Sequence, residues 1–190
     1  MRHSTPFSVC VFCGSAHGSD PRFADAAAAV GREIARRGWR LVYGGGKVGL
    51  MGLLANAALE ARGQVVGVIP RFLYEWEVGH DGLTRLEIVE TLGERKRRMG
   101  ELSDAYLSLP GGIGTLDELF EALSWTQLRL EDKPNGLLNV SGFFDHLITY
   151  LDRATADGFI RPQHRELLTA GSEVSALLDL LFSRAASGSR

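Results

Sequence analysis

Cysteine and histidine are too scarce to build the sites they usually mark. Cys10 and Cys13 are the only two cysteines, which excludes a disulfide-stapled domain and a structural zinc site made by cysteine alone. They form a CxxC pair, but 9–12 is predicted as a buried strand, on which residues three apart point to opposite faces, so a redox motif is poorly supported. The five histidines show no HExxH or other paired metal spacing. We expect no protein-held metal.

The chain has no large excess of positive or negative charge and no long apolar run. The chain has 21 Lys and Arg against 23 Asp and Glu, a net charge of -2, which gives no overall field to attract nucleic acid or an anionic membrane. No apolar run approaches the roughly 20 residues that span a bilayer, and the N-terminus shows no signal-like apolar stretch. We expect a cytoplasmic protein that binds neither nucleic acid nor membrane. Any anion site must then be formed by a few neighbouring residues and not by the overall charge.

Short apolar runs alternate along the 190 residues with segments of helical period. The runs that predict strands are 8–13, 40–43, 64–69, 86–90, 105–109, 136–140 and, less regularly, 166–169. The segments that predict helices are 21–37, 49–61, 92–102, 115–128, 143–157 and 173–185. Such runs between amphipathic helices are typical of a parallel sheet buried on both faces. The fold class is therefore α/β, a doubly wound parallel sheet in a single domain over 1–190, with its core at 8–183 and a short disordered tail at 185–190.

Glycine, by contrast, is abundant, with 23 residues, and two of its clusters directly follow predicted strands. The first reads YGGGKVGLMG over 43–52. Its glycines let the backbone approach a ligand and leave N–H groups at a helix N-terminus free to hold a phosphate, so it predicts an anion site. Close packing of helix against strand is the plainer alternative.

The same cluster contains two partial nucleotide-binding patterns. Gly44, Gly46 and Gly49 form GxGxxG, but the next strand ends IPR, without the acidic residue that binds a ribose. NAD is therefore disfavoured, and NADP has only the weak support of Arg71. The Walker A pattern fails because Lys47 is followed by valine.

The second cluster reads LPGGIGTLDE over 109–118, again from a strand into a helix. Two such turns in one sheet favour a ligand with a phosphate and a further group, such as a phosphorylated sugar or a nucleotide. Glu118 lies three residues after Thr115, which is also the spacing of a capping box, so a purely structural role is an equal alternative. In a first helical turn the dipole favours ionised Glu118, a base or charge stabiliser, with Glu121 one turn further on.

A basic run, Arg95-Lys96-Arg97-Arg98, lies in the predicted helix 92–102. Helical spacing puts Arg95 and Arg98 on one face and Arg97 on another. One arginine can therefore face a ligand site at the carboxyl ends of the strands. Its planar fork suits a phosphate or a carboxylate. The residues alone favour a solvated helix face, and the balanced net charge argues against a nucleic-acid patch.

The combination of PGGIGTLDE at 110–118, ERKRRM at 94–99 and YGGGKVGLMG at 43–52 resembles the LOG family ("lonely guy" proteins). Members of that family are cytokinin-activating nucleoside 5'-monophosphate phosphoribohydrolases, often mislabelled lysine decarboxylases. The resemblance runs from about 12 to 170. It implies a Rossmann-like fold, a homodimer with active sites near the subunit interface, no cofactor, and hydrolysis of the bond between an adenine-type base, N6-modified or plain, and ribose 5-phosphate.

The same resemblance implies roles for particular residues. It makes Arg95 and Glu118 catalytic. The residues that it implies for binding the nucleoside 5'-monophosphate are Ser15, Gly45, Glu77, Lys96, Gly112, Ile113, Gly114, Thr115 and Ser124. Lys47, Trp76 and the stretch 79–83 depart from the family pattern, which bears on base preference.

Two other functions compete with the hydrolase. A non-catalytic nucleotide or cofactor carrier of the same fold would keep the glycine turns but lack the pair Arg95 and Glu118, and both residues are present. A pyridoxal-phosphate decarboxylase has no support, because no lysine stands out as the Schiff-base residue. The hydrolase is therefore the prediction.

Overall fold

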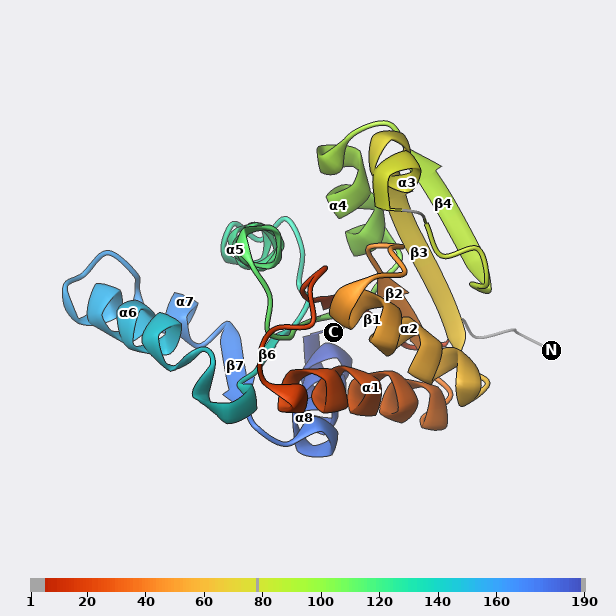
Figure 1. The fold of residues 1–190 in the computed structure, drawn as a ribbon. Helices are drawn as coiled ribbons and strands as arrows, with labels where there is room; N and C mark the ends of the chain where they lie inside the picture. Colours follow the sequence, from red (N-terminus) through yellow and green to blue (C-terminus); the bar gives the residue numbers. More distant parts are fainter. Residues whose placement is uncertain (1–5, 78, 189–190) are drawn as a thin grey trace.

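Seven parallel strands form one sheet with helices on both faces (Figure 1). The computed structural model describes residues 6–77 and 79–188, with the side chains of 77 and 188 outside the description. The strands are β1 (Ser8–Phe12), β2 (Arg40–Tyr43), β3 (Gln64–Pro70), β4 (Arg85–Val89), β5 (Ala105–Ser108), β6 (Asn135–Leu138) and β7 (Leu168–Gly171). Their order is β4-β3-β2-β1-β5-β6-β7, so the predicted doubly wound α/β fold is confirmed.

The direction of winding reverses between β1 and β5. Val9 of β1 lies opposite Leu41 of β2 on one side and opposite Ala105 of β5 on the other. Every residue of β1 and β5 is buried, as expected for continuous apolar runs covered on both faces. Ligands of open α/β sheets bind at the carboxyl ends of the strands at such a switch point, so this position directs the search for a site.

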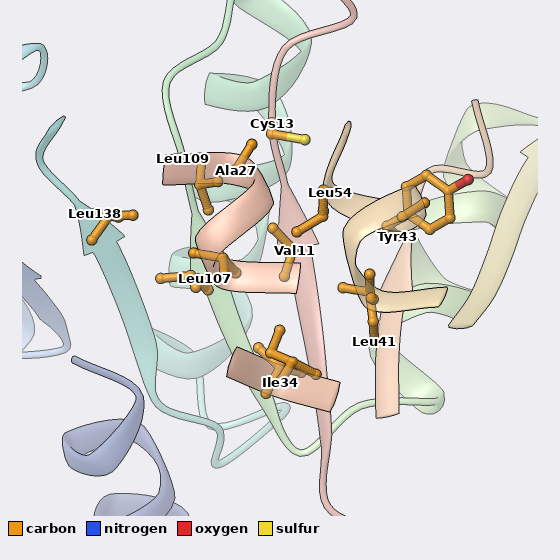
Figure 2. Packing of buried hydrophobic residues seen from close by; sticks show 14 of the residues in the cluster. Val11, Cys13, Ala27, Ile34, Leu41, Tyr43, Leu54, Leu107, Leu109 and Leu138 are labelled. Atoms are coloured by element: carbon orange, nitrogen blue, oxygen red, sulfur yellow. The ribbon is translucent and has the colours of Figure 1, made fainter. Parts of the chain in front are cut away.

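Helices cover each face of the sheet. One layer consists of α1 (Pro21–Arg36), α2 (Gly49–Glu60) and α8 (Val174–Gly188), and the other of α4 (Leu92–Glu101), α5 (Ile113–Gln127) and α6 (Asp145–Ala156). Figure 2 shows Ile34 and Leu54 of the first layer beside Val11 and Leu107 of the sheet.

The two cysteines face opposite layers, as predicted for their positions on a strand. Cys10 packs in the cluster under α4 and α5, and Cys13 packs in the cluster under α1 and α2. Both are buried free thiols. The CxxC spacing therefore reflects two core positions and does not form a redox pair.

The helix that carries the basic run begins at a well-defined residue. Thr91 is the N-cap of α4, and its hydroxyl accepts a hydrogen bond from the backbone N–H of Glu94 at 3.1 Å. The Glu94 carboxylate in turn accepts from the backbone N–H of Glu90 at 3.0 Å. These two hydrogen bonds fix the first turn of α4, just before Arg95.

Some elements differ from the sequence expectation. The short helices α3 (Arg71–Glu77) and α7 (Pro162–Arg165) and the 3-10 turn η1 (Val140–Gly142) were not predicted, because such short segments carry little periodicity. The helix α8 extends to Gly188, so 185–188 are helical where the sequence predicts a disordered tail over 185–190. Within the described residues, no helix is long and apolar enough to cross a membrane.

Candidate active site

A cavity of about 320 Å³ lies at the switch point, beyond the carboxyl ends of β1 and β5. Both Arg95 and Glu118 line it. The other lining residues come from the end of β1, the two glycine turns and the helices α2, α3 and α4: Val11, Phe12, Cys13, Gly14, Ser15, Gly44, Met51, Leu73, Leu92, Gly112, Ile113, Gly114 and Thr115. Its volume suits a ligand of nucleotide size.

The second glycine turn presents an open helix N-terminus to this cavity. Gly112 is the N-cap of α5, and no side chain caps the helix. A Cβ added at Gly112 or Gly114 would meet no atom within 4 Å, so neither glycine is required by packing. The first N–H groups of a helix have no partner inside it, and here they border the cavity, which makes them suitable for an anion. The N-terminus of α5 is therefore open toward the cavity.

The capping-box interpretation of Thr115 and Glu118 is wrong. α5 begins at Ile113, so Thr115 is already inside the helix and Glu118 lies beyond the first turn. The Thr115 side chain is buried and occupies the space that a Cβ on Gly111 would need. The helix dipole therefore does not account for the charge state of Glu118.

Arg95 and Glu118 face each other inside the cavity. Arg95 Nη1 lies 3.6 Å from Glu118 Oε1, and the two side chains are only 12% and 11% exposed. Arg95 Nε donates to the backbone oxygen of Val68 at 3.1 Å, and Nη2 donates to that of Gly44, also at 3.1 Å. The guanidinium is thus held by backbone carbonyls near the ends of β2 and β3, while its Nη1 group faces the carboxylate of Glu118.

Burial raises the pKa of Glu118 above its ordinary value. Arg95 opposes this rise, Asp117 adds to it, and smaller effects come from Lys96 and Glu121. Burial thus shifts Glu118 toward its neutral form, opposite to the effect expected from the helix dipole. A carboxyl with a raised pKa exchanges protons more readily near neutral pH, which suits general acid–base chemistry.

The first glycine turn does not form the free anion site that its sequence predicts. The N–H groups of Leu50 and Met51, at the start of α2, donate to the backbone oxygen of Gly14 at 3.1 and 3.4 Å. Gly49 has a φ of 60°, and a Cβ there would overlap the backbone of Ser15. The glycines at this helix N-terminus serve close packing, because the loop that follows β1 covers the first N–H groups of α2.

Gly44 has a different role, which the sequence alone did not indicate. A Cβ on Gly44 would overlap the guanidinium of Arg95, so only glycine leaves room for the arginine to reach its two carbonyl acceptors. The next carbonyls along the turn are also occupied: Gly45 accepts from the backbone N–H of His80 at 3.0 Å, and Gly46 accepts from the Tyr43 hydroxyl at 3.1 Å. The turn is a rigid support for Arg95.

The basic run divides between cavity and solvent. Arg95 is buried, so the solvated interpretation of the whole run is wrong for it. Arg97 is 70% exposed, and Arg98 pairs with Glu87 at 2.7 Å and with Glu101 at 3.0 Å. A single arginine faces the cavity, as the helical spacing allows.

Three residues implied to bind substrate, Gly45, Lys96 and Ser124, lie outside the lining of this cavity. Gly45 packs against Ile69, and Lys96 is paired with carboxylates of α5. The Ser124 hydroxyl donates to the backbone oxygen of Phe120 and borders a separate groove. Glu77 ends α3, but its side chain lies outside the described residues.

The apolar wall of the cavity was not identified from the sequence. It includes Leu73, on the unpredicted helix α3, together with Leu92 and Met51. Leu73 and Leu92 belong to no motif, and only the approach of α3 and α4 to the sheet edge brings them to the cavity. They offer a surface for a flat or apolar group beside the polar pair.

The sequence of this chain is similar to a known family and to named enzymes. The chain matches the family model described as "Possible lysine decarboxylase" over residues 51–181. It is 46% identical over 180 residues to a cytokinin riboside 5'-monophosphate phosphoribohydrolase of Rhodococcoides fascians, covering 94% of this chain and 91% of that protein. It is 44% identical over 173 residues to the enzyme of that name, LOG5, from Arabidopsis thaliana, covering 91% and 76%.

Solved structures of similar fold are more distant. A Moco carrier protein from Chlamydomonas reinhardtii superposes with a TM-score of 0.72 at 20% identity, covering 96% of this chain and 99% of that one. A molybdenum cofactor binding protein from Rippkaea orientalis gives 0.71 at 22% identity, covering 95% and 98%. At these identities the likeness concerns the fold alone.

Proposed function

This chain belongs to the LOG family of phosphoribohydrolases, and on that premise we propose that its cavity hydrolyses the N-glycosidic bond of adenosine 5'-monophosphates, N6-modified or plain. The products are the free base and ribose 5-phosphate. The observation that supports this most is the buried pair of Arg95 and Glu118, 3.6 Å apart, in a cavity that also contains the open N-terminus of α5.

The proposed chemistry follows from the charges that develop in the reaction. Breaking the bond from the base to the anomeric carbon leaves positive charge on the ribose. The carboxylate of Glu118 stabilises that charge and accepts a proton from the attacking water, whose oxygen bonds to the anomeric carbon. A carboxylic acid formed in this way can return the proton to the departing base, because burial already favours its neutral form.

The other residues bind and orient the nucleotide. The N–H groups at 113–115 and the Ser15 hydroxyl are proposed to hold the 5'-phosphate, since both border the same cavity. Arg95 orients Glu118 and retains N–H groups that can contact the phosphorylated sugar. The wall formed by Leu73 and Leu92 receives the base.

The alternatives have weaker support. The carrier proteins share only the fold, at 20–22% identity, whereas the relatives at 44–46% identity are named as hydrolases. A lysine decarboxylase needs a lysine for its aldehyde cofactor, and no described lysine lines the cavity. The buried free thiols of Cys10 and Cys13 are consistent with the cytoplasmic location that we propose.

A panel of adenosine-type nucleosides with and without the 5'-phosphate tests the proposed function. We expect release of free base from the monophosphates and release slower by about one to two decades from each matching nucleoside, because a charged phosphate contact contributes roughly 1.5 to 3 kcal/mol. Chromatography of the free base is the measurement. Equal turnover of nucleoside and nucleotide contradicts phosphate anchoring, and nucleotide binding without any base release favours the carrier.

We also propose a homodimer that forms through the outer face of α5. Ile113 is 88% exposed there, and together with Phe120 it borders a groove of about 400 Å³ that Ser124 also lines. Exposed apolar surface of this kind marks an interface. The family resemblance implies that Ser124 contacts substrate, yet Ser124 borders this groove and not the cavity of its own chain. It can contact a nucleotide only if the cavity of a partner chain lies next to this groove.

Replacing Phe120 by glutamate is expected to convert the dimer to a monomer and to lower activity, because a charge would be buried at the interface. The measurement is molar mass by light scattering at micromolar concentration. Leu180→Glu is the control, since Leu180 is similarly exposed but lies on α8, in the opposite layer. A wild-type monomer with full activity would show that no partner is needed.

A further inference from the structure

Lys96, next to the catalytic pair, makes contacts that differ from those of a substrate-binding residue. Its ammonium lies 3.0 Å from Asp117 Oδ2 and 2.6 Å from Glu121 Oε2, and its side chain is only 17% exposed. The Oε2 atom of Glu121 is shielded from solvent. Lys96 is therefore engaged by two carboxylates of α5 and does not line the cavity.

These two carboxylates flank Glu118 on the same helix. Asp117 precedes Glu118 directly and Glu121 follows it by one turn, so α5 carries three acidic groups in a short stretch. Two cations of α4 face them: Arg95 meets Glu118, and Lys96 meets the other two. Two cations therefore face three carboxylates, and solvent screens the charges least at Arg95, Glu118 and Lys96, whose side chains are mostly buried.

We propose, on the basis of the function proposed above, that Lys96 is a positioning residue that acts through Glu118. By pairing with Asp117 and Glu121, it offsets part of their negative charge and keeps Glu118 available as a carboxylate opposite Arg95. In its absence, two uncompensated like charges on α5 would drive Glu118 toward its neutral form, which cannot stabilise positive charge on the ribose.

The charged surroundings of Glu118 are consistent with this role. Burial is the main cause that raises the pKa of Glu118, Asp117 and Glu121 raise it further, and Arg95 and Lys96 lower it. The other titratable groups in this region are the thiols of Cys10 and Cys13, from β1, which stay neutral because burial raises their pKa. Tyr106, near Glu121, also stays neutral, since burial and its hydrogen bond to Glu131 raise its pKa.

Lys96 itself remains a cation in this setting. Burial alone would lower the pKa of Lys96, but hydrogen bonds to Glu121 and Asp117 outweigh burial and raise it. Lys96 is therefore protonated over the whole range in which Glu118 titrates, and its influence on Glu118 is constant there.

The test compares Lys96→Met with Arg97→Met, which removes the same charge from an exposed site on the same helix. Two quantities are measured for each variant. One is the titration of the Glu118 side-chain carboxyl by carbon NMR in the unliganded protein, with Glu118→Gln as the assignment control. The other is the pH profile of kcat/KM for base release from AMP.

We expect Lys96→Met to move the Glu118 titration and the acid limb of the profile to higher pH. Activity should then fall several-fold on the acid side and less at high pH. Arg97→Met should leave both unchanged, and Lys96→Arg should restore them. Glu121→Gln should move both toward lower pH, because it removes a like charge, and it decides the question if Lys96→Met does not fold.

An unmoved Glu118 titration in Lys96→Met and Glu121→Gln, with KM raised equally at all pH values, would overturn the proposal and make Lys96 a substrate contact. The NMR titration does not depend on turnover. A wild-type protein that releases no base therefore contradicts the proposed function, while the titration still decides how Lys96 acts on Glu118.

Discussion

Replacing Glu118 by glutamine is expected to lower turnover of AMP on the order of a hundredfold or more, while nucleotide binding largely survives. The amide keeps the size of the side chain but cannot stabilise positive charge on the ribose or accept a proton from water. Steady-state release of free base gives the rate, and calorimetric binding of the nucleotide gives the affinity. Near-normal turnover in this variant would leave Glu118 without a catalytic role and favour the carrier function.

The stability of Glu118→Gln provides the matching control. Because burial raises the pKa of Glu118, the fold favours its neutral form. The stability that this group contributes is fully present below its unfolded pKa and is lost as pH rises through its folded pKa. Glutamine stays neutral, so we expect the variant to unfold no more easily than the wild type at neutral pH and to lack this pH dependence. Urea unfolding at acidic and neutral pH measures both.

Replacing Arg95 by methionine is expected to reduce both turnover and stability. Turnover should fall by about two decades, because Glu118 loses the charge opposite it and the sugar loses a contact. Stability should fall by about 1 to 3 kcal/mol, since the carbonyls of Val68 and Gly44 lose their donor. Arg97→Met is the matched control and should change neither quantity, because Arg97 is largely solvent-exposed.

The double variant with Glu118→Gln and Arg95→Met tests whether the pair acts as a unit. We expect the double variant to lose little turnover beyond the worse single change, because residues that act together are not additive. Fully additive losses would mean that the two side chains contribute independently, for example with Arg95 on the phosphate alone. The rates of the four proteins, measured under one set of conditions, complete the cycle.

Much of the architecture was predictable because it depends on local pattern. Continuous apolar runs identified the buried strands, and the two-residue period of a strand placed Cys10 and Cys13 on opposite faces. At the second glycine turn, where the sequence predicts a phosphate-binding turn, the N-terminus of α5 has no side-chain cap. Residue type and order were sufficient for the strands and for the two cysteines, which depend only on local pattern.

The tertiary structure alone decided how the proposed catalytic groups, Arg95 and Glu118, are arranged. The first glycine turn resembles a phosphate loop in sequence, but the β1 loop covers its helix, and Gly44 instead leaves room for Arg95. The basic run looks like a solvated face, yet Arg95 is largely buried and donates to the backbone carbonyls of Val68 in β3 and of Gly44 just after β2. The charge state of Glu118 likewise depends on burial against segments far away in the chain. Sequence spacing defines neighbours along a helix or strand, whereas desolvation and long-range contacts arise only once distant segments pack together.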